Sequence, residues 1–166
     1  MSEDKKIKIY MAGGIQYAPD KGEVWRKELQ QWAKDNKLLV QFVSPLDTKA
    51  NKKNDDLFIY TDADKWAINM DKIRDGDFDL IDSCDAIVTL YDEYAGDGTN
   101  REIEETRRIK HVNYFIQGRS RKKFPHWVLN NLILGQQEKV VVWLWSLEEF
   151  KDLVLLQYGD KESEIK

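Results

Sequence analysis

The segment from Ala86 to Ile116 limits the possible folds more than any other part of the chain. It begins with Ala86–Tyr91, a short, mostly apolar run bounded by acids, as in a buried parallel strand. Gly96–Thr99 then predicts a tight turn with two glycines, and a helical pattern follows at Asn100–Lys110. A second apolar run comes next, at Val112–Ile116. A strand that leads through a glycine turn into a helix and on to another strand is the repeating unit of an open α/β sheet.

The same alternation continues on both sides of this segment. Further strands are expected at Ile7–Met11, Leu38–Val43 and Lys139–Leu144, and further helices at Val24–Ala33, within Asp64–Leu80, at Phe124–Leu134 and after Ser146. Gly135 is expected to end one of these helices, and Ser146 with Glu149 to form a capping box at the start of the last. Five strands alternating with helices predict an α/β fold. We expect a flavodoxin-like doubly wound five-stranded parallel sheet of order 2-1-3-4-5, with helices on both faces.

Composition narrows the class of protein. The chain has 166 residues, with no internal repeat or linker, and is predicted to form a single domain over residues 1–166. We expect an exposed loop at Thr48–Asp56 and a charged tail after about residue 159. The net charge of −4 argues against a nucleic-acid polymer as partner, and the single cysteine, Cys84, favours a reducing compartment and a small buried position. No apolar run approaches the ~20 residues that span a membrane, and the charged start is unlike a signal peptide, so no membrane association and a cytoplasmic location are expected.

The loops after the first and third strands are expected to face one crevice, because the strand order reverses between these strands. These loops carry Gly13-Gly14 and Gly96–Thr99. Neither matches the two common nucleotide fingerprints, and no Cys/His cluster has metal-ligand spacing, so neither a metal nor another cofactor is expected. What the crevice offers is carboxylates: Asp77, Asp97 and Glu102. Paired acids suit glycosyl chemistry, in which one carboxylate attacks the anomeric carbon and another acid protonates the leaving group.

Glu102 is the strongest candidate for the attacking group. It follows the glycine turn and is predicted to lie in the first turn of a helix. There the helix dipole would favour its ionised form, as a nucleophile or base requires. A second acid, Glu104, stands two residues on, but side chains at this spacing point apart on a helix.

Four short pieces also follow one another in a recognisable order. They are a strand that ends in Tyr and a small-residue turn (Ile9–Gly14), two aspartates eight residues apart (Asp77 and Asp85), an acid–glycine turn that leads to a glutamate (Asp97–Glu102), and a late Asn-Leu pair (Asn131-Leu132). In this order, over roughly residues 7–154, the chain resembles the nucleoside 2′-deoxyribosyltransferase family.

The resemblance implies an enzyme without a cofactor that transfers the 2′-deoxyribosyl group between nucleobases. The reaction is a double displacement through a covalent glycosyl-glutamate intermediate, and the partners are nucleosides and free nucleobases. By this resemblance Glu102 would be the nucleophile and Tyr10 would orient it. Asp77 and Asp97 would contact the base and support its protonation as it leaves.

Substrate contacts are expected from the two loops that face the crevice, at Gly13, Gly14, Gly98 and Thr99, and from a tryptophan that would stack on the base, Trp66 or Trp127. The resemblance adds Asn131, which would contact the sugar. Asn130 is an alternative to Asn131. Because family members often receive this contact from a neighbouring subunit, a homo-oligomer is implied.

Two other hypotheses stay open. Related nucleotide N-glycosidases share this scaffold and hydrolyse nucleoside 5′-monophosphates; here Arg101 and the Arg119–Lys123 loop would bind the phosphate. A non-catalytic nucleotide-binding module is the third hypothesis. It is suggested by Asn100, Arg101 and Glu104, which replace small or apolar residues of the family. The sequence does not distinguish purine from pyrimidine bases, or deoxyribose from ribose.

Overall fold

The computed structural model describes residues 5–15, 17–47 and 63–159, and for residues 63–71 it describes the backbone alone. The predicted loop at Thr48–Asp56 and the predicted charged tail therefore lie outside the described residues. Within them, strands and helices alternate along the chain as β1 (Ile7–Gly13), α1 (Glu23–Asp35), β2 (Val40–Val43), α3 (Ala63–Asp82), β3 (Ala86–Tyr91), α4 (Asp97–Arg108), β4 (Val112–Gln117), α5 (His126–Gln137), β5 (Val141–Leu144) and α6 (Leu147–Tyr158). Two short 3-10 helices are η1 (Pro45–Asp47) and η3 (Arg121–Lys123).

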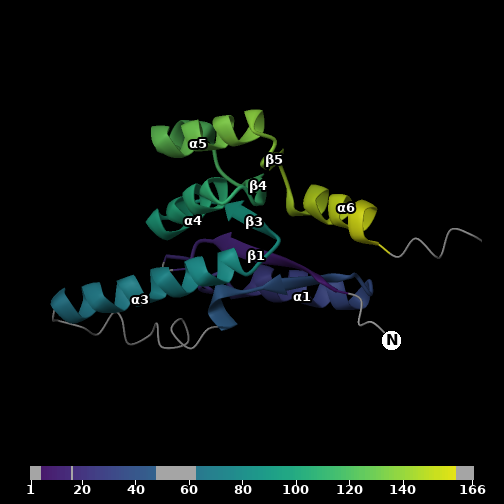
Figure 1. Cartoon of the computed structure of the whole chain (residues 1–166), viewed down its shortest axis with the longest axis horizontal. Coiled ribbons are helices and arrows are strands. Elements are labelled where there is room, and N and C mark those ends of the chain that lie inside the picture. Colours follow the sequence, from purple (N-terminus) through teal and green to yellow (C-terminus); the bar gives the residue numbers. More distant parts are fainter. Residues whose placement is uncertain (1–4, 16, 48–62, 160–166) are drawn as a thin grey trace, which may run out of the picture.

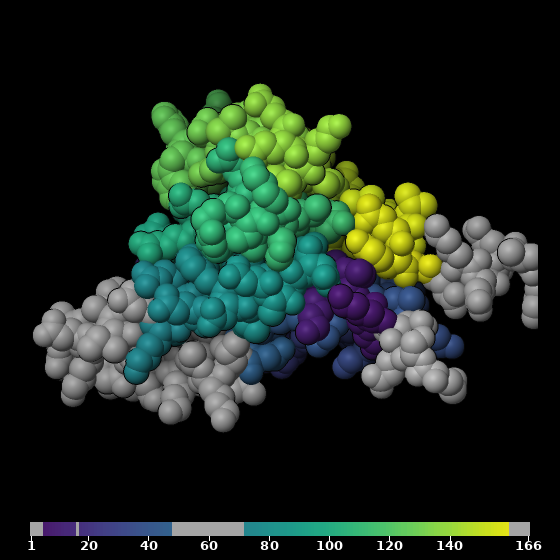
Figure 2. Space-filling model, in the orientation of Figure 1, coloured from purple at the N-terminus to yellow at the C-terminus, as the bar shows by residue number. Residues whose placement is uncertain are grey.

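The five strands form one parallel sheet in the order β2-β1-β3-β4-β5, which confirms the predicted fold. Helices α1 and α6 pack on one face, and α3, α4 and α5 on the other (Figure 1). Figure 2 shows residues of α3, α4 and α5 following one another in sequence order across the visible surface. None of the helices in the described ranges is long and apolar enough to cross a membrane.

Alternation along β1 decides which side chains reach the α3–α4 side. Ile9 and Met11 pack in the core beneath α1 and α6, whereas Tyr10 and Ala12 pack with the residues of α3. Successive side chains of a strand point to opposite faces, so this split follows directly from the pleat. Tyr10 is thereby directed toward the layer that also contains Glu102.

Two predicted boundaries are wrong, both at glycines. Gly96–Thr99 is not a turn with positive φ: Gly96 has an extended backbone, with φ −121°, and α4 already begins at Asp97. Gly135 does not end α5, which continues to Gln137. Gly135 lies inside this helix, and the position requires glycine because a Cβ there would overlap with the side chain of Val141. Gly96 has an extended backbone just before a helix, and Gly135 allows a helix to pack closely against Val141. The sequence alone does not distinguish these two roles from a turn.

Two smaller predictions are confirmed. The Glu149 amide donates to Ser146 Oγ at 3.1 Å, and the Glu149 carboxylate accepts from the Trp145 amide at 2.7 Å, so the last helix begins with a reciprocal cap. This differs from the usual capping box only in that the carboxylate reaches the residue before the cap. Cys84 is a free, buried cysteine.

The loops after β1 and β3 are in contact, as expected for the point where the strand order reverses. A Cβ at Gly14 would overlap with the backbone carbonyl of Tyr94, so only glycine fits this approach.

Gly14→Ala is therefore expected to destabilise the protein by about 1–3 kcal/mol, because backbone has to move. Gly76→Ala is the control: nothing lies within 4 Å of a Cβ at this position in α3. There alanine should stabilise the helix by about 0.5–1 kcal/mol. Urea denaturation compares the two, and equal effects would contradict the close approach.

Candidate active site

A tyrosine and a glutamate, distant in sequence, form a buried pair between the sheet and α4. Tyr10 on β1 donates its hydroxyl hydrogen to Glu102 Oε1 at 2.6 Å, across 92 residues of sequence. Tyr10 is fully buried and Glu102 is 7% exposed. The half-buried Asp77, in the C-terminal part of α3, acts electrostatically on both. The structure thus brings together three of the four predicted catalytic residues.

Burial, not the helix dipole, dominates the ionisation of Glu102. Its pKa is raised to about 8, first by burial and then by the negative charge of Asp77; the Tyr10 hydrogen bond and Arg26 act in the opposite direction. The expected stabilisation of the anion by the dipole is outweighed, because α4 begins at Asp97 and Glu102 lies beyond its first turn. Glu104 is exposed and does not contribute, as the helical spacing predicts. The site therefore favours a protonated Glu102 until another group stabilises the anion.

Tyr10 is a fixed hydrogen-bond donor. Burial and the neighbouring Glu102 carboxylate raise the pKa of its hydroxyl well above the ordinary value, so it stays protonated at neutral pH. A neutral hydroxyl at 2.6 Å can hold one carboxylate oxygen and leave the other available. This geometry agrees with the orienting role that the family resemblance implies.

The other predicted site residues lie in different surroundings. Gly13 and Gly14 are buried at the end of β1, and Thr99 is buried in the first turn of α4. Asp97 and Gly98 are exposed at the start of α4, and the structure does not bring Asp97 to the Tyr10–Glu102 pair. Trp66 belongs to α3, but its side chain lies outside the described residues.

Asn131 is engaged at the interface between α4 and α5. Its Oδ1 accepts from Arg107 Nη1 at 2.8 Å and its Nδ2 donates to the Trp127 carbonyl at 3.2 Å. The neighbouring Asn130 is exposed. Within one chain, Asn131 is thus bound to the C-terminal part of α4 and not to Tyr10 or Glu102.

Arg26 is a buried cation at the end of β1 that the sequence prediction does not include. It is 1% exposed, and its guanidinium donates to the carbonyls of Met11, Gly13 and Gly22 at the end of β1 and the start of α1. The available signal is its spacing: Arg26 stands three residues before Leu29 and seven before Ala33, on the core-facing side of α1. Val24, which the apolar pattern places on that face, is 63% exposed.

A second polar cluster lies where β3 and β4 end. Tyr91 donates to Asn100 Oδ1 at 2.6 Å and accepts from Arg119 Nη2 at 2.9 Å. The Arg119 guanidinium also stacks over the Tyr91 ring, 4.4 Å from its centroid. Asn100, which departs from the family's pattern, is therefore a buried partner of Tyr91 and not a surface residue.

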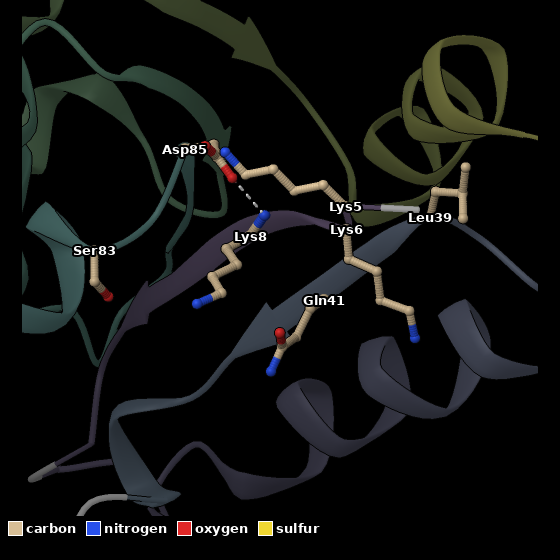
Figure 3. Close-up of a pocket in the computed structure, with 7 residues that line it drawn as sticks. All are labelled: Lys5, Lys6, Lys8, Leu39, Gln41, Ser83 and Asp85. Carbon is tan, nitrogen blue, oxygen red and sulfur yellow. Dashed lines mark hydrogen bonds between the residues drawn. The ribbon is translucent and has the colours of Figure 1, made fainter. Parts of the chain in front are cut away.

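A groove of about 820 Å³ lies at the other edge of the sheet, along the amino ends of β1, β2 and β3 (Figure 3). Its residues are Lys5, Lys6, Lys8, Leu39, Gln41, Ser83 and Asp85. Asp85 accepts a hydrogen bond from the backbone amide of Lys8, and every side chain of the set is exposed. None of the predicted site residues lines this groove. It is a surface depression without buried polar groups, so the buried Glu102 is the better candidate for a catalytic residue.

Comparison with known proteins adds no family assignment. The sequence matches no protein-family model, and a search of curated proteins finds no match.

The raised pKa of Glu102 predicts a specific pH dependence of stability. The native protein retains this proton up to about pH 8, whereas an unfolded chain releases it near the ordinary value of ~4.3. The stabilisation is therefore fully present below the unfolded value and is lost as the pH rises toward 8. Glu102→Gln, which cannot ionise, should gain stability relative to the native chain between pH 5 and pH 8, on the order of a few kcal/mol.

Urea denaturation of both proteins at the two pH values measures this gain. Glu104→Gln, an exposed substitution on the same helix, is the control and should track the native chain at both. A stability difference between Glu102→Gln and the native chain that stays constant with pH would contradict the buried protonated carboxyl.

Proposed function

We propose that this protein transfers the 2′-deoxyribosyl group of a nucleoside to a second nucleobase, with Glu102 as the nucleophile. One observation carries the proposal: a glutamate and a tyrosine form a buried hydrogen bond of 2.6 Å beside an aspartate, in the crossover region of a doubly wound sheet. Two acids with a neutral donor suffice for glycosyl transfer without a metal.

The first displacement uses the groups in distinct roles. Glu102 attacks C1′ of the nucleoside, the bond from C1′ to the base nitrogen breaks, and its electron pair leaves with the base. Before the attack, the proton of the buried Glu102 passes to Asp77, which leaves Glu102 anionic. Asp77 then gives this proton to the departing base, and Tyr10 holds the nucleophile in line. In the second displacement a new base attacks C1′, its N–H proton goes to Asp77, and the ester bond to Glu102 breaks, so the pair again holds one proton. Two inversions leave the anomeric configuration unchanged.

Burial of the Tyr10–Glu102 pair favours a nucleobase over water as the acceptor of the sugar. Tyr10 and Glu102 are almost inaccessible to solvent. A covalent sugar ester held in such surroundings meets a bound base more readily than water. Transfer is therefore proposed over hydrolysis.

The test is chromatography of the products after incubation with deoxyinosine and free adenine. A new deoxyadenosine peak supports the proposal. Incubation with adenine and inosine, which differs only by the 2′-hydroxyl, shows whether the sugar is restricted to deoxyribose. Absence of any exchanged product, with a folded protein, would overturn the transferase assignment.

A second candidate function is hydrolysis of a nucleoside 5′-monophosphate. The observation that favours it is Arg119, whose guanidinium is held by Tyr91 near the carboxyl ends of β3 and β4 and has a buried Nε without a hydrogen-bond partner among the described residues. A guanidinium in this arrangement suits a phosphate. Free base that appears from deoxynucleoside monophosphates, but not from nucleosides, would favour this candidate. Binding of nucleotides without turnover would favour the non-catalytic module.

A further inference from the structure

Arg26 is a buried cation whose hydrogen bonds all go to neutral groups. Nε donates to the Met11 carbonyl at 3.2 Å, Nη1 to the Gly22 carbonyl at 2.7 Å and Nη2 to the Gly13 carbonyl at 3.1 Å. Among the described residues, no carboxylate lies within ion-pair distance of the guanidinium. A buried charge is costly unless opposite charges compensate for it. The three carbonyl dipoles compensate for part of this cost, and opposite charges that are not in contact add to them.

The nearby charges are those of the proposed active site. Glu102, Tyr10, Asp77 and Asp20 all act electrostatically to favour the charged form of Arg26, against the effect of burial. The interaction is reciprocal, since Arg26 opposes the rise in the pKa of Glu102. The groups that act electrostatically on Glu102 are thus Tyr10 from β1, Asp77 from α3 and Arg26 from α1. Arg26 is the one cation in this described set.

Arg26 also fixes the loop that leads from β1 to α1. Its guanidinium links the last residues of β1 to Gly22 through hydrogen bonds to their carbonyls, and Gly22 has a left-handed backbone with φ 68°. A Cβ at Gly22 would overlap with the Arg26 guanidinium and the Gly14 carbonyl. The Asp20 carboxylate accepts two further hydrogen bonds, from the backbone amides of Gly22 and Val24. The loop is therefore packed around the guanidinium, one residue from Tyr10 along β1.

We propose that Arg26 is a positioning residue of the active site, which supplies the positive charge against which Glu102 ionises beside Asp77 and holds the β1–α1 loop in place. A nucleophile has to be anionic before it attacks, and the ester that forms is neutral. Arg26 favours the anion, while burial and Asp77 oppose it. As far as it concerns catalysis, this inference rests on the proposed function; the charge balance itself does not.

The decisive measurement is the titration of Glu102 without substrate, by ¹³C NMR of the labelled side-chain carboxyls, with the Glu102 signal assigned from Glu102→Gln. In Arg26→Gln the midpoint of Glu102 should rise by about one pH unit or more, since an opposite charge nearby is removed. Arg107→Gln is the matched control. This arginine is partly buried on the helix of Glu102 but pairs with Glu138, so the midpoint should not change. An unchanged midpoint in Arg26→Gln would overturn the inference.

Arg26→Lys separates charge from geometry. It retains the positive charge, but its single nitrogen does not span the three carbonyls that the guanidinium fork reaches. Glu102 should therefore titrate as in the native chain while the amides of Gly14 and Gly22 exchange faster with solvent. If Arg26→Gln does not fold, this variant decides. A native midpoint with faster exchange supports the inference, and native exchange or a shifted midpoint contradicts it.

These results are independent of the proposed reaction. If the native chain exchanges no base but the Glu102 midpoint follows Arg26, the proposed function fails and the charge balance stands. If base exchange occurs and the Glu102 midpoint is the same in Arg26→Gln as in the native chain, the proposed function stands and the inference fails. Where both hold, the acidic limb of the pH–rate profile should shift upward in Arg26→Gln by as much as the NMR midpoint.

Discussion

Glu102→Gln is expected to lower the rate of base exchange by at least about 10³-fold, the largest effect of any single substitution in this chain. An amide oxygen does not form the covalent bond to C1′ on which the proposed mechanism depends. The amide does preserve the size of the side chain, and its oxygen can still accept the hydrogen bond from Tyr10. The variant should therefore fold, and at neutral pH it should be at least as stable as the native chain. The measurement is kcat for the formation of deoxyadenosine from deoxyinosine and adenine.

Two comparisons make this result specific to the nucleophile. Glu104→Gln, on the exposed side of the same helix, should retain the native rate. Incubation of the native chain with deoxyinosine alone, without an acceptor base, should add the mass of a deoxyribosyl group to the peptide that contains Glu102. The adduct should be absent in Glu102→Gln. Retained exchange in that variant, or an adduct on another residue, would remove Glu102 from its proposed role.

The fold could be predicted because each strand is a short apolar run between polar segments. Ala86–Tyr91 is observed with the same bounds as predicted, since it is buried on both faces and ends at acids. Boundaries at glycines were harder, because glycine fits a turn, a helix start and a close helix–strand contact equally well. Gly96 and Gly135 took the second and third of these roles, which only the neighbouring backbone determines.

The candidate site was predictable only in part. The pairing of Tyr10 with Glu102 follows from strand alternation and from collinear resemblance, and the structure brings the two side chains together. The ionisation of Glu102 was not predictable, because burial depends on how α3 and α4 cover the sheet. Arg26 has no signature beyond a charge at a core-facing helical position. Asp97 matches the family motif in sequence, yet α4 already begins at Asp97, three residues before the predicted start at Asn100, and the Asp97 side chain is exposed.

Asp77→Asn is expected to have the second-largest effect, a fall in the rate of base exchange of about 10²-fold or more, as for the loss of a general acid. The same substitution should lower the pKa of Glu102, because it removes a like charge that acts on the buried carboxyl. The acidic limb of the pH–rate profile then moves to lower pH while its plateau falls. Asp79→Asn, an exposed neighbour on α3, is the control and should change neither.

The two effects of Asp77→Asn have opposite consequences, and this separates its possible roles. If Asp77 acts on Glu102 only through its negative charge, its neutralisation would make Glu102 ionise more readily. The reaction near neutral pH would then be faster. An acid that protonates the leaving base would leave a slower reaction at every pH, despite the better ionised nucleophile. The proposed mechanism requires the second pattern, and a purine with an electron-withdrawing substituent, which leaves without protonation, should recover much of the lost rate. A faster reaction in Asp77→Asn would make Asp77 a charge that Arg26 has to balance, and would assign the protonation step to another group.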